Sequence, residues 1–556
     1  MKGRLAVVWL AATTGVIACG NDSTDRPSAG SVAVQALTPN VAGVCSGDFT
    51  VHSLAELTAL SRCEEITGSL EIQAEANIVD FGPLEHLRRI GGDFMATHAE
   101  SFRGLTALKA VGGDLSFRDI GTGGRLEGPS ALETVGGEFS FYQISATEWI
   151  GPSTLTRADA LTIYGSSILR HIGGFSSLRE LETLTVTSHA QLTAFDDMPN
   201  LTTVDAVNFD QNDALETLSG FDGVREVGSL GFSLNKALTN VSAFSQVTEV
   251  RDLFFGHCPH LATVGLPHLE SIEGSLSLLY LPELTSLDWL RNVTSIGEDL
   301  SLWGDLGVRD LHGLEGITSV ERFFTIQYGN LQRLTGLRNL RQAGGLHIIQ
   351  NKDLESLRDL ESFRENTRSG YDGIHIDGNL ALTEIGGLDR LVDAGGRIDI
   401  VDNPKLTRLH GLHGIRAADV LNVWGNPALT QLDGLDSLEH IAGFVRVEGN
   451  ALSSVDELEK LTRIDGELKI DSEPSLLHLD GFHALQAIGG ELHINNNRAL
   501  ARLDALKGLL SLGGNLEVTN NATLPPCQPE RLVTELRARG YQGQVTLRDN
   551  GGGTCP

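Results

Sequence analysis

Apolar residues recur along this chain with two superimposed spacings. Within short segments they alternate with polar residues, as Leu468 and Ile470 do with Lys469 and Asp471. Alternation with period two is typical of a β-strand with one buried face. Such segments return at a constant interval, beginning at Leu161, Leu184, Val207, Leu230, Leu253 and Leu276. A constant interval in the range of about 20–50 residues predicts stacked supersecondary units, that is, a solenoid.

The remainder of each coil has a different spacing. In the coil that begins at Leu421, the apolar residues are three apart: Leu429, Leu432, Leu435, Leu438 and Ile441. Threefold spacing favours turns and short extended legs over a sustained helix with its period of 3.6. Parallel strands need a crossover, which this part of the coil supplies. We therefore expect an all-β solenoid, a right-handed parallel β-helix of about 20 leucine-rich coils with disulfide-closed caps.

The fifth residue after the start of the strand is asparagine in nine coils. These residues are Asn212, Asn235, Asn351, Asn379, Asn403, Asn426, Asn450, Asn497 and Asn521. An inward asparagine at a corner can bond backbone groups of its own and the adjacent coil, so we expect a structural ladder. Cys258 occupies the same position in its coil and is expected to be a buried thiol. Its neighbours His257 and His260 would turn to different sides, so we predict no metal site there.

The remaining cysteines of the body lie at the two ends of the array. End coils expose a strand edge and an apolar cross-section, so they need caps. Disulfides suit an exported protein, and we predict the pairs Cys45–Cys63 and Cys527–Cys555. The solenoid would then span residues 45–525.

The C-terminal cap is expected over residues 526–556. A helix is predicted from Pro529 to Arg539, with Gly540 as its stop, and a strand is predicted over 544–548. Within the array, the segment 362–373 lengthens one coil, whose strand begins at Leu346 while the next begins only at Ile374. Insertions often lie on a binding face, and the region 360–373 is also a candidate seam between two halves.

Residues 1–18 have the features of an export signal. Lys2 and Arg4 precede an apolar run that is too short to span a bilayer. Val16-Ile17-Ala18-Cys19 resembles a bacterial lipobox, which implies lipidation of Cys19. By the same resemblance, Gly20 in place of an aspartate implies the outer membrane. The alternative is a plain signal peptide with a chance cysteine. Residues 19–44, rich in Ser, Gly, Pro and Asn, are typical of a flexible tether.

The formal net charge is -30. Such a charge argues against nucleic acid as a partner and against electrostatic docking on anionic lipid. We therefore expect contact with the membrane only through the N-terminal lipid anchor.

The head of the array resembles a known family. Cys45-Ser-Gly-Asp-Phe-Thr-Val, followed by Leu57, Leu60 and Cys63-Glu-Glu-Ile-Thr-Gly-Ser-Leu-Glu-Ile, is similar to the opening of a receptor L domain. Coils such as Gly481–Ile494 are similar to its leucine-rich repeat. The resemblance implies a β-helical fold and extracellular recognition, of the kind found in bacterial L-domain lipoproteins. The chain has no cysteine-rich module, membrane-spanning helix or kinase, so receptor signalling is not implied.

No sequence motif for catalysis or cofactor binding is present. His410 and His413 are expected to be solvated turn residues, and no cofactor or metal is predicted. The candidate ligand face consists of aromatic residues at outward strand positions: Tyr142, Tyr164, Trp303 and Trp424. The alternative for each is that another leg or loop of the chain covers it.

The sequence thus favours a non-enzymatic lipoprotein of the cell surface that binds a protein or a glycan through its solenoid side. One alternative is a structural component of the envelope that acts by self-association. A second is a polysaccharide-cleaving β-solenoid enzyme, which would need acids that converge on the sheet.

Overall fold

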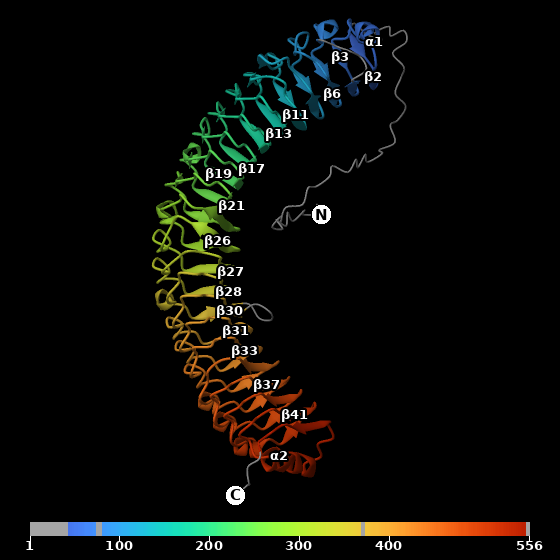
Figure 1. Ribbon diagram of the computed structural model, residues 1–556. Helices are drawn as coiled ribbons and strands as arrows, with labels where there is room; N and C mark the ends of the chain where they lie inside the picture. The colour runs from blue at the N-terminus through green and yellow to red at the C-terminus, as the bar shows by residue number, and fades with distance from the viewer. Residues whose placement is uncertain (1–42, 74–79, 368–372, 552–556) are drawn as a thin grey trace.

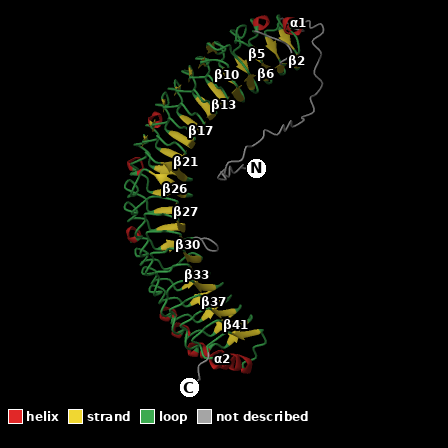
Figure 2. Ribbon diagram, viewed as in Figure 1, coloured by secondary structure: helices red, strands yellow, loops and turns green. Residues whose placement is uncertain are grey.

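Residues 43–73, 80–367 and 373–551 are described by the computed structural model. They form one curved parallel β-solenoid of about 20 turns, which confirms the predicted fold class (Figure 1). The predicted signal peptide over 1–18, Cys19 and most of the predicted tether over 19–44 lie outside the described residues. The strands line the concave side of the arc, and loops cover its convex side (Figure 2). Outward side chains of the strands therefore face the hollow of the arc.

The main sheet has 30 strands. One strand per coil forms its concave ladder: β2 (Phe49–Val51), β4 (Leu70–Ile72), β6 (Phe94–Thr97), β8 (Leu115–Arg118), β11 (Glu138–Tyr142), β13 (Arg157–Tyr164), β15 (Glu180–Thr187), β17 (Thr203–Asp210), β19 (Glu226–Ser233), β21 (Glu249–Gly256), β24 (Leu276–Leu281), β26 (Leu300–Leu306), β27 (Ser319–Gln327), β28 (Gln342–Ile349), β30 (Gly373–Asp377), β31 (Arg397–Val401), β33 (Val420–Trp424), β35 (Val445–Glu448), β37 (Leu468–Asp471), β39 (Leu492–Asn495), β41 (Leu516–Thr519) and β42 (Val545–Arg548). Each pairs in parallel with the strand of the next coil, as Leu421 does with Val445.

Shorter strands complete the coils. Those joined to the main sheet are β1 (Val44–Cys45), β3 (Glu65–Ile66), β5 (Arg89–Ile90), β7 (Ala110–Val111), β10 (Thr134–Val135), β23 (Ser271–Ile272), β25 (Ser295–Ile296) and β29 (Glu365–Asn366). Three small sheets contain β9 (Arg125–Glu127), β12 (Glu148–Ile150), β14 (His171–Gly173), β16 (Ala194–Phe195) and β18 (Thr217–Leu218); β20 (Asn240–Val241) and β22 (Thr263–Val264); and β32 (Ala417–Ala418), β34 (His440–Ile441), β36 (Arg463–Ile464), β38 (Ala487–Ile488) and β40 (Ser511–Leu512).

Within the described residues, helical structure is confined to single turns and to one α-helix near each end. The 3₁₀ turns are η2 (Gly82–Leu84), η3 (Ser242–Phe244), η4 (Asp288–Leu290), η5 (Arg358–Leu360), η6 (Asp456–Leu458), η7 (Asp480–Phe482) and η8 (Asp504–Gly508). They fall where the sequence has apolar residues three apart, because a 3₁₀ turn repeats every three residues.

The N-terminal end is closed as predicted. Cys45 and Cys63 form a disulfide, with their Cα atoms 5.7 Å apart. Helix α1 (Leu54–Ala59) lies between them, and the Oγ of Ser53 accepts a hydrogen bond from the backbone N–H of Glu56 at its start.

At the other end, helix α2 (Cys527–Ala538) begins two residues earlier than predicted and buries Leu532 and Leu536 against the last coils. The strand predicted over 544–548 is present as β42, and it also continues the concave sheet by pairing with β41. Cys555 lies outside the described residues, so its pairing with Cys527 stays a prediction.

The apolar residues of each coil point inward and form a continuous core. In β37, Leu468 and Ile470 are buried while Lys469 and Asp471 are partly exposed, which confirms the predicted alternation. Residues of equal phase stack from coil to coil. The rings of Phe209 and Phe232, for example, are 5.6 Å apart and nearly parallel.

The predicted asparagine ladder is present inside the concave corner, and all nine residues are buried. The backbone N–H of Asn403 donates to Oδ1 of Asn426 in the next coil at 3.0 Å. The Nδ2 of Asn426 in turn donates to the carbonyl oxygen of Ile400 at 2.9 Å. Each side chain therefore satisfies polar backbone groups at the corner of its own coil and of the preceding one.

The ladder also contains residues that were not predicted to belong to it. His189 accepts the backbone N–H of Ser166 on Nδ1 at 3.2 Å, and its Nε2 lies 3.1 Å from the carbonyl oxygen of Ile163. Burial lowers the pKa of His189 to about 4, so the ring is neutral. Glu473 takes the same place between Asn450 and Asn497. Other polar groups of suitable reach can thus replace asparagine.

The long coil at 362–373 does not interrupt the pairing of strands. β28 pairs with β30 from Leu346 and Ile374 onward. The backbone N–H of Asn351 reaches Oδ1 of Asn379 in the next coil at 3.0 Å, across the insertion. Residues 368–372 of this segment lie outside the described residues.

Candidate ligand-binding face

The four aromatic residues proposed from the sequence lie on concave strands. Tyr142 ends β11 and Tyr164 ends β13, and their rings are 6.2 Å apart. Trp303 lies in β26 and Trp424 ends β33, so each is several coils away from the other members. Tyr164 is exposed, and the other three are partly covered. The structure therefore brings only the two tyrosines together.

Trp303 belongs to a row of rings that was not predicted from the sequence. It stacks with Tyr328 at a centroid distance of 6.1 Å, with 24° between the ring planes. His257 stacks with Tyr280 at 4.9 Å and 21°. Tyr280 and Tyr328 are 41% and 43% exposed. We call His257, Tyr280, Trp303 and Tyr328 the aromatic strip; they come from the consecutive coils of β21, β24, β26 and β27.

The two ring pairs are connected at Gly304, which follows Trp303. A Cβ atom on Gly304 would lie 2.5 Å from Cε1 of Tyr280, so the ring of Tyr280 leans over this glycine. Gly304 has a φ of +77°. Glycine is needed here both for its backbone conformation and for the space that the ring fills.

Three members of the strip have an unusual backbone. His257, Tyr280 and Tyr328 have φ values of +54°, +50° and +54°. This left-handed conformation costs a side chain other than glycine about 1 kcal/mol or more. Many coils place glycine, asparagine or aspartate at this corner, as at Gly165, Gly378, Asp402, Gly425, Gly449, Asn496 and Asn520, and others place glutamine, serine or leucine there, as at Gln143, Ser188 and Leu234. The coils of the strip instead carry large rings in exposed positions, where they gain little core packing.

The strip coincides with a part of the ladder that contains no asparagine. Cys258, Leu281 and Gly329 follow His257, Tyr280 and Tyr328 directly. None of the three offers the side-chain amide that the ladder uses elsewhere. Leu281 pairs with Leu306 across a register shift, so the corner is irregular in this region.

A second feature of the concave side lies at Trp424. The guanidinium carbon of Arg446 lies over its ring, 4.9 Å from the centroid. Arg446 also lines a shallow depression of about 360 Å³, together with Phe444, Val445, Glu467 and Lys469. Trp424 is thus stacked on a cation from the next coil, and much of one face is already covered.

Charged residues on the concave strands are held by ion pairs and hydrogen bonds within a strand and between strands. Asp399 is buried and accepts hydrogen bonds from Nε and Nη2 of Arg397 at 2.7 and 3.0 Å, and from Nδ2 of Asn422 at 3.0 Å. Burial alone would raise the pKa of Asp399, but hydrogen bonds from His375, Arg397 and Asn422 outweigh it and lower the pKa to about 2. Such a carboxylate stays ionised and is poorly suited to proton transfer near neutral pH.

Three acids do converge on the main sheet around His493. Its Nε2 lies 2.9 Å from Glu491 and 3.8 Å from Glu467, and its Nδ1 lies 3.3 Å from Glu517. This convergence is what the enzyme alternative requires. The hydrogen bond from His493 lowers the pKa of Glu491, however, whereas a glycosidic general acid needs a raised pKa. The arrangement therefore suits ion pairing better than acid catalysis.

The motif GHCPH gives no cluster of ligands. His257 stacks on Tyr280, while Nδ1 of His260 pairs with Glu283 at 2.9 Å. Cys258 is a buried free thiol, and burial raises its pKa to about 11. These residues turn to different sides, as the sequence predicted.

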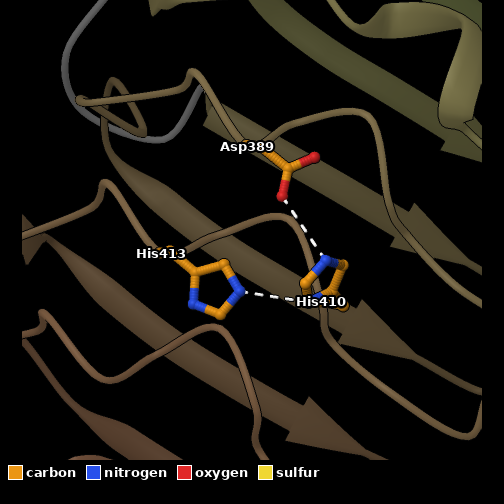
Figure 3. Close-up of side chains that lie close together, drawn as sticks. All are labelled: Asp389, His410 and His413. Carbon is orange, nitrogen blue, oxygen red and sulfur yellow. Dashed lines mark hydrogen bonds and ion pairs between the residues drawn. The ribbon is translucent and has the colours of Figure 1, made fainter.

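His410 and His413 lie in exposed turns, as expected, but they do not stand alone. Asp389 of the preceding coil approaches them, and the three side chains point toward one another (Figure 3). The two histidines are evident as a pair in the sequence. The aspartate is not, because it lies one repeat before His413.

The comparisons with known proteins add little to this picture. No protein-family model and no curated protein matches the sequence. Among solved structures, the chain is similar to a leucine-rich repeat protein from Bacteroides eggerthii DSM 20697, with a TM-score of 0.29 and 10% identity over 74% of this chain and 71% of that one. A likeness at this level carries no functional argument, so the description as a leucine-rich solenoid rests on the coils themselves.

Neither α-helix of the described part of the chain is long and apolar enough to cross a membrane.

Proposed function

We propose that this protein is a non-enzymatic recognition protein that binds its ligand on the concave face through the aromatic strip. The observation that carries the proposal is the row of His257, Tyr280, Trp303 and Tyr328 on consecutive coils, in which every ring but that of Trp303 is exposed and has a costly left-handed backbone. Exposed aromatic residues give large, rigid contact areas at low cost in conformational entropy.

A linear neutral glycan fits this surface best. Coils stack at about 4.8 Å, so the rings repeat along the axis of the solenoid and can contact successive units of an extended chain. Several weak contacts on one ligand add through effective concentration. The net charge of -30 disfavours an anionic polysaccharide. A protein ligand would be expected to use a pocket that buries a central anchor residue, and the strip is a row on a sheet face.

Location is part of the proposal. The lipobox-like segment that ends at Cys19 and the tether over 19–44 support attachment by lipid to the outer membrane, with the solenoid held at the cell surface. The resemblance of the Cys45–Cys63 head to receptor L domains supports an extracellular recognition role. The disulfide between these two cysteines agrees with export.

A glycan array probed with the folded, lipid-free chain tests the function. The expected result is selective binding to a family of neutral polysaccharides or oligosaccharides. A pull-down from envelope extracts runs beside it. If the array is blank and the pull-down captures a protein, the ligand is a protein and not a glycan. If both experiments are blank, the recognition role is contradicted. Sedimentation velocity with and without calcium separates recognition from self-association, because recognition predicts a monomer in both conditions.

A further inference from the structure

Two histidines and one aspartate converge at a place on the solenoid distinct from the aromatic strip. Asp389 belongs to the coil of β30, and His410 and His413 belong to the coil of β31. One potential ligand atom from each lies within 4.8 Å of the others. Nε2 of His413 is 3.1 Å from Nδ1 of His410, and Nε2 of His410 is 3.7 Å from Oδ1 of Asp389 (Figure 3).

The repeat itself produces this convergence. Asp389, His413 and Asp436 follow one another at intervals of one repeat, so they occupy the same phase in three successive coils and form a column. Coils stack at about 4.8 Å, which places each of these side chains beside the next. His410 lies in the same turn as His413. Gly411 between them has a φ of +122°, a conformation that favours glycine and lets the turn close.

Asp436 orients the central ring. Nδ1 of His413 lies 2.6 Å from Oδ1 of Asp436. An ionised carboxylate can only accept, so Nδ1 of His413 carries the proton and Nε2 presents its lone pair to the cluster. The carboxylate of Asp389 is held in turn by the backbone N–H of Gly387 at 3.3 Å. A carboxylate behind a histidine in this way is the usual support of a metal-bound imidazole.

We propose that Asp389, His410 and His413 bind one divalent transition metal of the zinc class. Two imidazole nitrogens and one carboxylate oxygen are a donor set that suits zinc, nickel or copper, whereas calcium and magnesium prefer oxygen ligands throughout. The three side chains are 49%, 55% and 39% exposed, so an ion can enter from solvent and keep at least one position for water.

Titration of the metal-stripped full chain with Zn²⁺, followed by isothermal calorimetry, tests the site. The expected result is one tightly bound ion per chain, which is lost in His410→Ala and in His413→Ala and weakened in Asp389→Asn. Co²⁺ serves as a spectroscopic probe, because nitrogen and oxygen ligation shifts its visible bands. Asp389 and His410 are exposed and His413 is partly exposed, so the unfolding curves of the metal-free variants should change little.

His440→Ala is the matched control, because His440 is a partly exposed histidine whose Nε2 pairs with Asp465 at 2.9 Å, outside the cluster. It should retain the full stoichiometry. Asp436→Asn should keep the stoichiometry and the Co²⁺ spectrum and weaken affinity about 10- to 100-fold, with partial recovery in Asp436→Glu. The proposal is overturned if the wild-type chain takes up no tightly bound Zn²⁺, or if the histidine variants bind it as the wild type does.

Discussion

Nδ2 of Asn450 donates a hydrogen bond to Oε1 of Glu473 at 2.8 Å inside the solenoid. The backbone N–H of Asn450 reaches the same oxygen at 3.0 Å, and that of Leu452 reaches Oε2 at 3.2 Å. Glu473 is fully buried. Burial raises its pKa to about 7, although the hydrogen bonds from Asn450 and Leu452 oppose the shift. An acid in the asparagine ladder therefore titrates near neutral pH.

The stability of the solenoid should fall with rising pH because of Glu473. The folded chain holds the proton up to about pH 7, whereas an unfolded glutamate loses it near pH 4.3, so the stabilisation is present below that value and is lost as pH rises toward 7. We expect a loss on the order of 2–3 kcal/mol between pH 4.5 and 8. Denaturant unfolding of the wild type and Glu473→Gln at both pH values measures it. Glu473→Gln should lack this part of the dependence and be the more stable protein at pH 8; equal slopes would refute the assignment.

Removal of an internal rung should be costly. Oδ1 of Asn403 accepts from the backbone N–H of Asn379 at 3.0 Å, and its Nδ2 donates to the carbonyl oxygens of Ile376 and Val401 at 3.0 and 2.8 Å. Asn403→Ala leaves these buried groups without a partner, and we expect about 3 kcal/mol less stability. Asn200→Ala is the control, because exposed Asn200 makes one bond to a carbonyl oxygen. Urea unfolding of both variants measures the loss of stability. A similar loss in the two variants would contradict a structural ladder.

Cys258 should be chemically inert in the folded chain. Its pKa of about 11 keeps the buried thiol protonated, and the thiolate is the reactive form. Ellman's reagent at pH 8 should label it only after unfolding, and Cys258→Ser should lack that reactivity. Rapid labelling of native protein at this residue would show that the corner opens.

The identity of the rung at Cys258 can also be changed. Its Sγ lies 3.9 Å from the carbonyl oxygen of Phe232, which is the kind of acceptor that the Nδ2 of Asn235 finds at Phe209 one coil earlier. Cys258→Asn should therefore fold and be at least as stable as the wild type in thermal unfolding. A loss above about 2 kcal/mol would mean that this corner does not accept an amide.

Much of the fold could be predicted because the period of the repeat determines which residues are buried. The period assigned Leu468 and Ile470 to the core and Cys258 to the ladder, and the structure agrees. His189 and Glu473 were not predicted to belong to the ladder, because the prediction followed residue type. The corner position accepts any buried side chain with a suitable donor or acceptor. The start of α2 was misplaced by two residues because helix ends are weakly encoded.

The candidate sites were harder to predict for a different reason. Tyr280 and Tyr328 lie one residue beyond the strand positions that were compared, in a left-handed corner that is visible only once backbone angles are known. Asp389 and His413 are far apart in sequence and meet because coils stack. A comparison of residues at the same position in successive coils would have revealed both candidate sites, whereas local sequence motifs could not.

Gly304 should be required for the strip. In Gly304→Ala the new Cβ would lie 2.5 Å from the ring of Tyr280 and displace it. Gly165→Ala is matched in backbone, with a φ of +78° against +77°, but its nearest neighbour would be Gln143 Cγ at 3.7 Å. Both variants should lose about 1 kcal/mol of stability in urea unfolding from backbone strain. Only Gly304→Ala should also weaken ligand binding, and equal binding by the two variants would show that Tyr280 is not held by Gly304.

The affinity of the glycan selected on the array for Tyr280→Ala/Tyr328→Ala tests the central claim most directly. Each ring is expected to contribute about 0.5–1.5 kcal/mol, so the double variant should bind roughly 5- to 150-fold more weakly in calorimetry. The control is Leu477→Ala/Leu510→Ala, which removes two exposed apolar side chains outside the strip, at 53% and 55% exposure, and should bind as the wild type does. Wild-type affinity in Tyr280→Ala/Tyr328→Ala, with the fold intact, would contradict recognition through the aromatic strip.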